Sequence, residues 1–303
     1  MFSRYPTRAL LALIPTLVLW ASAFAGIRAA LRAYSPAQLA LFRFLIASAA
    51  LAIYAAFVHF RPPKLRDLPS LVAGGAIGVT FYNLALNYGE VHVSAGAASL
   101  LIASTPIWTA LIAMVMLHER LTPLGWLGVV VSFAGVALIA SGEGQGIHLS
   151  VEALAILAAA ITSGVYLVQQ KHFLDHYSAL EFTAYTIWFG TLLMLPFGAG
   201  TLQAVAAAPL HSTLAVIYLG VFPGAFSYVA WAYVMSHGPA GQTSTFLYLE
   251  PVLAIAIAWI WLGELPNWIS LTGGFIALAG VFLVTFRGHA QSVVSPMLSQ
   301  PAD

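Results

Sequence analysis

The sequence predicts an all-α polytopic membrane protein, with ten transmembrane helices arranged as two inverted-topology five-helix repeats. Three observations predict this class. Hydrophobic residues make up 61% of the chain and charged residues only 7%, whereas soluble domains carry about a quarter charged residues. Charge-free runs are long enough to cross a bilayer, which takes about 20 residues. Segments of the first half also recur in the second half.

The charge-free runs mark the expected spans. Four of them cover residues 9–27, 68–89, 91–118 and 121–142, and a run of 68 residues from 182 to 249 must hold several spans. Helices satisfy their own backbone hydrogen bonds in hydrocarbon, and the sequence lacks the alternating pattern of a membrane barrel. We expect spans at residues 9–29, 36–59, 68–88, 92–117, 123–141, 150–171, 180–199, 212–235, 240–262 and 268–286.

The best preserved repeated segment is STPIWTALIAMVMLHER, which starts at Ser104 and recurs as LEPVLAIAIAWIWLGEL from Leu249. An offset of 145 residues pairs Pro106 with Pro251, Glu119 with Glu264, Gly128 with Gly273 and Gly135 with Gly280. The early helices match more weakly, with residues 20–24 against 162–166 and Ser35 against Ser178. Because five spans per repeat is an odd number, the second copy would enter the membrane from the opposite side.

Lys and Arg in the connections predict the orientation. With a cytoplasmic N-terminus, the cytoplasmic side holds Arg4, Arg8, Arg61, Lys64, Arg66, Arg120, Lys171 and Arg287, and the outer side holds Arg28 and Arg32. This is a positive-inside bias, so we expect both termini in the cytoplasm. Residues 1–8 would form the N-terminus, residues 9–141 and 150–286 the two repeats, and residues 287–303 a disordered cytoplasmic tail.

Composition argues against several other classes. A net charge of +1 without a basic patch does not predict a nucleic-acid partner. The chain has no cysteine, its nine histidines are scattered, and it shows no nucleophile motif. We therefore expect no enzyme activity, no metal site and no cofactor. The expected partners are a small-molecule substrate and the lipid bilayer, with no obligate protein partner.

Polar and aromatic residues near the middle of the spans are the candidates for a substrate cavity, since such side chains usually face the bundle interior. The substrate-binding candidates are Tyr82, Asn83, Asn87, Ser99, Thr105, Trp108, Tyr166, Trp188, Ser227, Tyr228, Ser244, Tyr248 and Glu250. The hinge candidates are Pro106, Pro223, Gly238, Pro239, Gly241 and Pro251. Each residue also has a structural interpretation, as a hydrogen bond between helices or part of an interfacial aromatic belt.

Two charged residues fall inside expected spans. Glu250 could hold a proton or a substrate ammonium, or it could cap backbone donors loosened by Pro251 or pair with an arginine. Arg43 could bind a carboxylate or pair with Glu250, or it could extend toward the interface and bond helix-end carbonyls. Glu119 and Glu264 lie at span ends, where we expect a structural role.

Several of these features together resemble the drug/metabolite transporter superfamily, in its EamA branch. They are Arg43 within FRFLIASA, the P-x12-E spacing that begins at Pro106 and again at Pro251, and the glycine pairs in the last helix of each half. The resemblance covers about residues 9–287. It implies a bacterial inner-membrane exporter of small metabolites that works by alternating access around a central cavity.

Within the branch, the chain is most similar to aromatic amino acid exporters. The expected cargo is therefore an aromatic or other neutral hydrophobic amino acid. Export of another metabolite or a drug, and a passive channel, remain alternatives. An intramembrane enzyme would need a nucleophile or metal set that the sequence does not offer.

Overall fold

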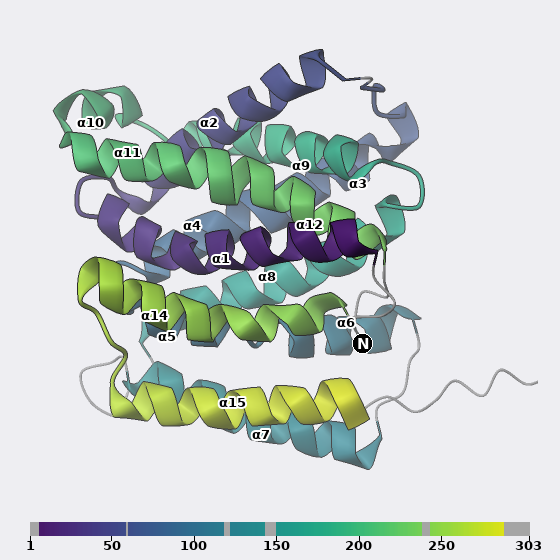
Figure 1. Cartoon of the computed structure of the whole chain (residues 1–303), viewed down its shortest axis with the longest axis vertical. Coiled ribbons are helices and arrows are strands. Elements are labelled where there is room, and N and C mark those ends of the chain that lie inside the picture. Colours follow the sequence, from purple (N-terminus) through teal and green to yellow (C-terminus); the bar gives the residue numbers. More distant parts are fainter. Residues whose placement is uncertain (1–5, 59, 118–121, 143–149, 238–242, 288–303) are drawn as a thin grey trace, which may run out of the picture.

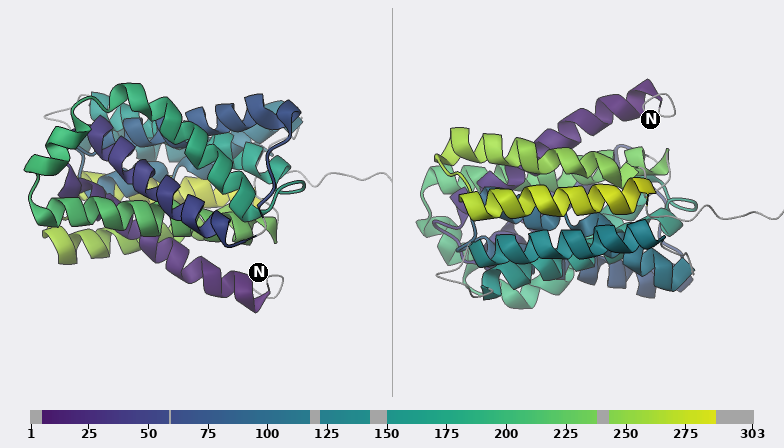
Figure 2. Two further views of the ribbon diagram at one scale, coloured as in Figure 1. Left: turned by 90° about the horizontal axis from the view of Figure 1, so that it is seen from above. Right: turned by 90° about the horizontal axis from the view of Figure 1, so that it is seen from below.

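The regular structure of the described residues is helical. The computed structural model describes residues 6–58, 60–117, 122–142, 150–237 and 243–287. Eight helical segments in this part are long and apolar enough to cross a membrane, and two shorter apolar helices follow at Phe246–Leu262 and Trp268–Val284. Their axes run in similar directions in the bundle (Figures 1 and 2). These features are those of a multi-pass membrane protein.

The helical segments are divided between the two halves of the chain. The first half contains α1 (Thr7–Ala30), α2 (Pro36–Ala56), η2 (Leu65–Asp67), α3 (Leu68–Gly74), η3 (Gly75–Phe81), α4 (Tyr82–Gly89), α5 (Ala95–Ile102), α6 (Thr105–Leu117) and α7 (Pro123–Gly142). The second half contains α8 (Val151–Phe173), α9 (Ala179–Met194), η4 (Leu195–Phe197), α10 (Thr201–Ala207), α11 (Leu210–Leu219), η5 (Gly220–Phe226), α12 (Ser227–Ser236), η6 (Ser244–Leu249), α14 (Glu250–Leu262) and α15 (Trp268–Arg287).

Serine caps start the helices that follow short turns. Ser35 and Gln38 form a capping box at the start of α2, and Ser178 and Glu181 form the same box at the start of α9. In each box the serine side chain accepts a bond from a free helix N–H and the third residue bonds back to the serine N–H, which satisfies two donors. The two boxes stand at the serines that the sequence repeat pairs with each other.

Two π-helical segments occupy matching positions in the halves. η3 covers Gly75–Phe81 and η5 covers Gly220–Phe226, which is the same offset that pairs the two proline segments. A Cβ added to Gly75 would lie 2.7 Å from the Thr186 carbonyl oxygen, and one added to Gly220 would lie 2.6 Å from that of Arg43. Arg43 and Thr186 are separated by the same number of residues as the two capping-box serines, so they are equivalent positions in the two halves. Each π segment therefore contacts the second helix of the other half at an equivalent residue. Only glycine permits backbones to approach this closely.

The last helices of the halves, α7 and α15, lie side by side (Figures 1 and 2). Gly128 contacts the segment around Gly280, and Gly135 contacts the segment around Gly273. As α7 ascends in sequence, its contacts on α15 descend, so the two helices are antiparallel. The four glycines form two contacting pairs. The sequence repeat pairs each glycine of one contact with a glycine of the other contact, so the two contacts are equivalent.

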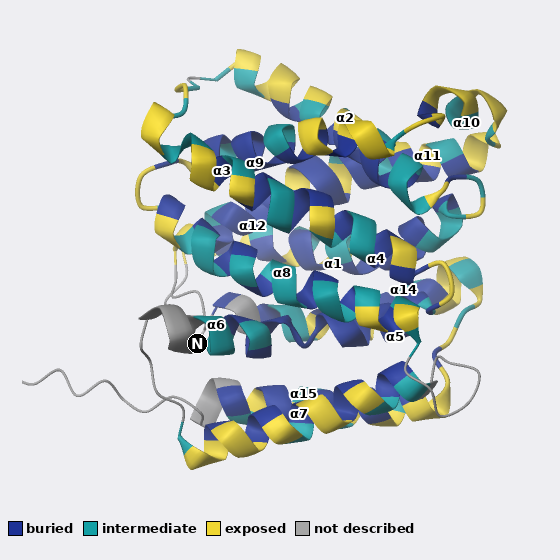
Figure 3. Cartoon of the chain, turned by 180° about the vertical axis from the view of Figure 1, so that it is seen from behind, coloured by how far each residue is buried: buried dark blue, intermediate teal, exposed yellow. Residues whose placement is uncertain are grey.

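Burial separates the bundle interior from its outer faces (Figure 3). Small and aliphatic side chains of α1, α5 and α8 form the largest buried cluster. On the outside, Phe57, Ile260 and Trp268 are each at least 79% exposed. Such large apolar surfaces are unfavourable in water but match the hydrocarbon that surrounds a polytopic bundle.

We predict that Gly135→Leu destabilises the protein, although leucine favours helix more than glycine does. A Cβ at this position would lie 2.3 Å from the backbone nitrogen of Ala277, which cannot move without shifting α15. We expect a cost of about 1–3 kcal/mol for such overpacking. The measurement is the melting temperature of the purified protein in detergent. Val130→Leu on the same helix is the control, because Val130 is 64% exposed, and equal melting temperatures for the two variants would contradict the prediction.

Candidate functional site

A cavity of about 90 Å³ lies inside the bundle, and both halves of the chain line it. Six aromatic residues contribute to its wall: Trp20, Phe24, Tyr82, Tyr166, Tyr228 and Trp231. Besides the tyrosines, two ionisable residues, Arg43 and Glu250, and two hydroxyl residues, Thr105 and Ser163, line it. A largely aromatic wall with a few polar groups is typical of small-molecule sites.

Trp20 of α1 organises the aromatic part of the cavity. Its ring centroid lies 5.5 Å from that of Tyr228 and 5.4 Å from that of Trp231. Its indole Nε1 donates to the Pro223 carbonyl at 3.1 Å. Pro223 lies within the π segment η5, where the ordinary helical hydrogen-bond ladder is altered. The side chain is thereby held both through its ring and at its polar edge.

Helices are interrupted on both sides of the cavity next to a proline. α5 ends at Ile102 and α6 begins at Thr105. Pro106 has no N–H, so it cannot donate to the Ile102 carbonyl four residues earlier. The Thr105 hydroxyl donates to that carbonyl instead, at 2.7 Å. In the second half the change from η6 to α14 falls at Glu250, immediately before Pro251.

Arg43 is held by an amide rather than by an acid. The residue is 3% exposed, and its Nη1 donates to Asn83 Oδ1 at 3.3 Å. Asn83 in turn donates to the Val79 carbonyl at 2.8 Å. The guanidinium carbon lies 5.3 Å from the centre of the Phe44 ring. No ion pair joins Arg43 to Glu250 within the described residues. Of the roles expected for Arg43, binding a carboxylate in the cavity is therefore the one that this position fits.

Three buried polar atoms of the cavity wall have no hydrogen-bond partner in the described part of the chain. They are Arg43 Nε, Trp231 Nε1 and Glu250 Oε1. The first two are donors and the third is an acceptor when the carboxyl group is ionised. A buried polar atom without a hydrogen-bond partner costs free energy, so each of the three is a candidate to bond a ligand atom.

Some of the residues predicted from sequence lie on the cavity and others do not. Those on the wall are Tyr82, Thr105, Tyr166, Tyr228, Glu250 and the hinge candidate Pro106. Two others bond to a different helix: Asn87 Nδ2 donates to the Pro36 carbonyl and Trp188 Nε1 to that of Ser48. Two more bond within their own segment: Ser99 donates to the Gly96 carbonyl and Trp108 Nε1 to the Ser104 hydroxyl.

The remaining predicted residues are dispersed. Ser227 is buried at the start of α12, and Tyr248 lies in η6 beside the cluster around Ile107. Pro223 lies in η5 and Pro251 in the first turn of α14. The Ser244 side chain and the hinge candidates Gly238, Pro239 and Gly241 lie outside the described part of the chain.

Sequence reasoning missed Trp20, Phe24 and Ile27, which line the cavity from one face of α1. Their spacing of four and three residues is the signal that could have found them. The repeat supplies a second signal, because Trp20 and Ser163, Ala23 and Tyr166, and Phe24 and Leu167 all lie on the wall at an offset of 143. The sequence pairing of residues 20–24 with 162–166 was therefore one residue out of register with these wall positions.

Later helices contribute to the wall at the offset of 145. The pairs on the wall are Leu86 with Trp231, Ile102 with Leu247, and Thr105 with Glu250. At these three pairs both halves line the cavity. Leu86 and Trp231 differ in size and Thr105 and Glu250 differ in charge, whereas Ile102 and Leu247 are both aliphatic.

Comparison with known proteins gives consistent results. The profile of the EamA-like transporter family matches residues 7–141 and again residues 150–286. A Bacillus subtilis protein called "Uncharacterized transporter YdfC" is 42% identical over 87% of this chain and 86% of its own. A Streptantibioticus cattleyicolor protein called "Probable terminal-alkyne amino-acid exporter" is 41% identical over 93% of this chain and 94% of its own.

More distant similarities extend this result. A Salmonella typhimurium protein called "Probable amino-acid metabolite efflux pump" is 24% identical over 89% of this chain and 92% of its own. A crystal structure with 20% identity shares the fold, with a TM-score of 0.64 over 93% of this chain and 97% of the other. Two consecutive family matches that together span most of the sequence, on a helical bundle with apolar membrane-spanning segments, show that this multi-pass membrane protein belongs to the EamA-like transporter family.

Proposed function

We propose that this chain is an exporter in the bacterial inner membrane, and that it carries aromatic or other neutral hydrophobic amino acids by alternating access around the aromatic cavity. The observation that carries the proposal is the set of three unpartnered polar atoms on the wall. Arg43 Nε and Trp231 Nε1 can donate to a carboxylate, and Glu250 Oε1 can accept from an ammonium group. A free amino acid carries both groups, and its side chain would pack against the aromatic residues.

The energetic reason for this preference is the cost of unmet hydrogen bonds. An unsatisfied buried polar group costs about 1–3 kcal/mol, more if it is charged. A ligand that pairs with all three atoms removes this cost, whereas a purely apolar ligand leaves it in place. The relative named as an amino-acid exporter supports the same class of cargo.

The two halves would be inverted repeats of five spans each. Support comes from the two π segments at equivalent positions, from the paired wall positions, and from the antiparallel contact of α7 with α15. In this arrangement the two shorter apolar helices Phe246–Leu262 and Trp268–Val284 serve as the ninth and tenth spans. Cytoplasmic termini follow from the distribution of Lys and Arg.

Transport would require the cavity to widen. Its volume of about 90 Å³ is far below the roughly 300–1,000 Å³ of typical ligand pockets. The proline-interrupted helices at Pro106 and Pro251 and the π segment around Pro223 are the places where the helices can bend with least loss of hydrogen bonding. The halves would rock about the cavity and open it to one side at a time.

We predict that purified protein in proteoliposomes transports Phe, Trp and Tyr, and to a lesser degree Met and Thr, with saturable kinetics. The aromatic wall favours apolar side chains, and a charged side chain would have to shed its water there. The measurement is initial flux for each amino acid, with and without a pH gradient. Preference for Lys or Glu would contradict the proposed cargo, and flux that does not saturate would indicate a channel.

We predict that Glu250→Gln removes recognition of the amino group. The wild-type protein should bind Phe more tightly than 3-phenylpropionate, which lacks the ammonium, by about 10- to 100-fold, as expected for one charged hydrogen bond. In the variant this ratio should approach one. The measurement is competition against labelled Phe transport.

Glu152→Gln is the matched control for this variant. Glu152 pairs with His92 at the start of α8, away from the cavity wall, so the control should keep the wild-type ratio. A Glu250→Gln protein that still prefers Phe as strongly as the wild type does would assign the carboxylate a structural role only.

A further inference from the structure

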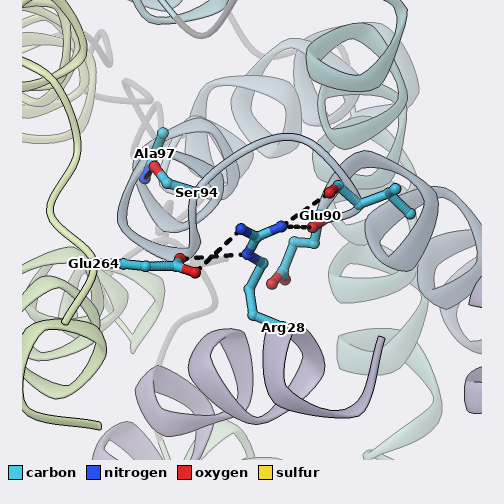
Figure 4. Close-up of polar contacts among 6 residues, drawn as sticks. Arg28, Glu90, Ser94, Ala97 and Glu264 are labelled. Carbon is cyan, nitrogen blue, oxygen red and sulfur yellow. Dashed lines mark hydrogen bonds and ion pairs between the residues drawn. The ribbon is translucent and has the colours of Figure 1, made fainter. Parts of the chain in front are cut away.

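Arg28, in the last turn of α1, ties three segments of the chain together at one end of the bundle (Figure 4). Its Nε and Nη2 donate to the two carboxylate oxygens of Glu264, at 3.3 and 3.1 Å. Its Nη1 donates to the carbonyl oxygens of Glu90 and Val91, at 2.8 and 2.9 Å. We call these contacts the Arg28 latch. It joins α1 to the turn after α4 and to the loop between α14 and α15.

The local backbone holds each partner of the latch in place. Gly263 ends α14 with a φ of 70°, a left-handed conformation that suits glycine. The N–H of Glu264 then bonds back to the Ala258 carbonyl, which fixes the residue that pairs with Arg28. The Glu90 and Val91 carbonyls follow the C-terminus of α4, where helix carbonyls lack partners within the helix. A cation there is favoured.

The latch lies over one end of the cavity. Ile27, the residue before Arg28, lines the cavity, and so does Leu86, one helical turn before Glu90. Arg28 and Glu264 are each 24% exposed, so water reaches the ion pair from outside the bundle. Any motion that separates α1 from the turn after α4, or from the loop between α14 and α15, must therefore break bonds of Arg28.

Glu90 lies beside the latch but takes no part in it through its carboxyl group. The residue is fully buried, and neither carboxyl oxygen has a hydrogen-bond partner in the described residues. The N–H donors of Arg28 are directed instead to Glu264 and to the two carbonyls. Figure 4 shows the Glu90 carboxyl group next to the guanidinium without a bond between them.

Burial raises the pKa of the Glu90 carboxyl well above its ordinary value of 4.5, and the charge of Glu264 raises it further. Arg28 and Arg43 act in the opposite direction but do not cancel the effect of burial. Two further ionisable groups near this end, Glu152 and His92, pair with each other at 3.3 Å, and the exposed Arg32 follows α1. The protonated, neutral form of Glu90 is therefore favoured while Arg28 is bonded to Glu264. An ionised Glu90 would compete with Glu264 for Arg28.

We propose that Glu90 is a proton-binding site that controls the Arg28 latch, so that loss of its proton to water releases Arg28 from Glu264 and opens this end of the cavity. This proposal rests on the alternating access proposed above. The latched state binds the proton more tightly than the open state does. Low pH therefore stabilises the latch, and that stabilisation is lost as the pH rises through the raised pKa of Glu90.

The other half of the chain repeats the cation but not the acid. Lys171 is the equivalent of Arg28 in the second half, because the two are separated by the same number of residues as the capping-box serines. Its Nζ donates to the Met235 carbonyl at 3.4 Å, as Arg28 donates to the Glu90 carbonyl. Met235 is the equivalent of Glu90, in the register of the two proline segments, and it cannot titrate. We therefore expect pH to act at the Arg28 end of the cavity and not at the Lys171 end.

The test uses single cysteines, since the chain has none of its own. Leu86→Cys reports the Arg28 end, and Leu167→Cys, one turn before Lys171 on the cavity wall, reports the other end. A membrane-impermeant maleimide is added to oriented proteoliposomes from the side of the reporter. Each labelling rate is divided by that of the same reporter in the Glu90→Gln background, because this ratio cancels the ionisation of the thiol itself.

For Leu86→Cys we expect a ratio near one at about pH 6 and about tenfold higher at about pH 9. For Leu167→Cys the ratio should stay near one. Glu264→Gln should raise labelling at Leu86→Cys throughout the pH range, because it removes the latch. His92→Gln and Glu152→Gln should keep the wild-type response to pH.

A ratio for Leu86→Cys that does not change with pH would overturn the proposal, and so would loss of the response in His92→Gln. If Glu90→Gln does not fold, the Glu264→Gln variant provides the test. Labelling of Leu86→Cys in that variant that is as slow at about pH 6 as in the wild type would reject the latch. Labelling does not depend on the cargo, so a protein that moves no amino acid but shows the expected ratios would refute the proposed substrate and keep the latch.

Discussion

Hydrocarbon offers no hydrogen-bond partners, so every polar group inside this bundle must be satisfied by the protein itself or by a ligand. Many hydroxyls meet this constraint on their own helix: Thr16 donates to the Ala12 carbonyl and Thr109 to that of Thr105. In the described residues, the charged and indole groups that keep an unpartnered buried atom are Arg43, Glu90, Trp231 and Glu250. All four lie on the cavity or at the Arg28 latch. The amide and hydroxyl groups that also keep an unpartnered atom do not line the cavity; they belong to Asn87, Ser132, Gln170, Ser212 and Ser227.

The two halves are alike where backbones touch and different where side chains face the cavity. Gly75 and Gly220 meet the neighbouring helix at equivalent residues, because a Cβ at either position would collide with backbone. The wall allows divergence, since a side chain there borders the cavity rather than a tightly packed backbone. Its diverged pairs include Leu86 with Trp231 and Thr105 with Glu250. A repeated backbone arrangement thus carries a cavity wall whose two sides differ in chemistry.

The candidate site could be predicted only in part. Tyr82, Tyr166, Tyr228 and Glu250 were found because aromatic or acidic residues in mid-span are unusual and tend to face inward. The same rule selected Asn87, whose amide joins α4 to the start of α2 instead. A polar side chain in mid-span serves helix packing and ligand binding equally well on sequence grounds, and only its position in the bundle separates the two.

The sequence by itself determined that the chain is a helical membrane protein with several spans and which segments repeat. Helix length in a membrane follows from a continuous apolar run, and the repeat follows from residue spacing, and both are local properties of the chain. Only the tertiary structure decided which charges meet. Arg28 and Glu264 are 236 residues apart in sequence, and Glu90 reaches them through a third segment. Whether a charge is paired, competed for or left without a donor depends on the distances that packing creates, and these are set by all the helices together.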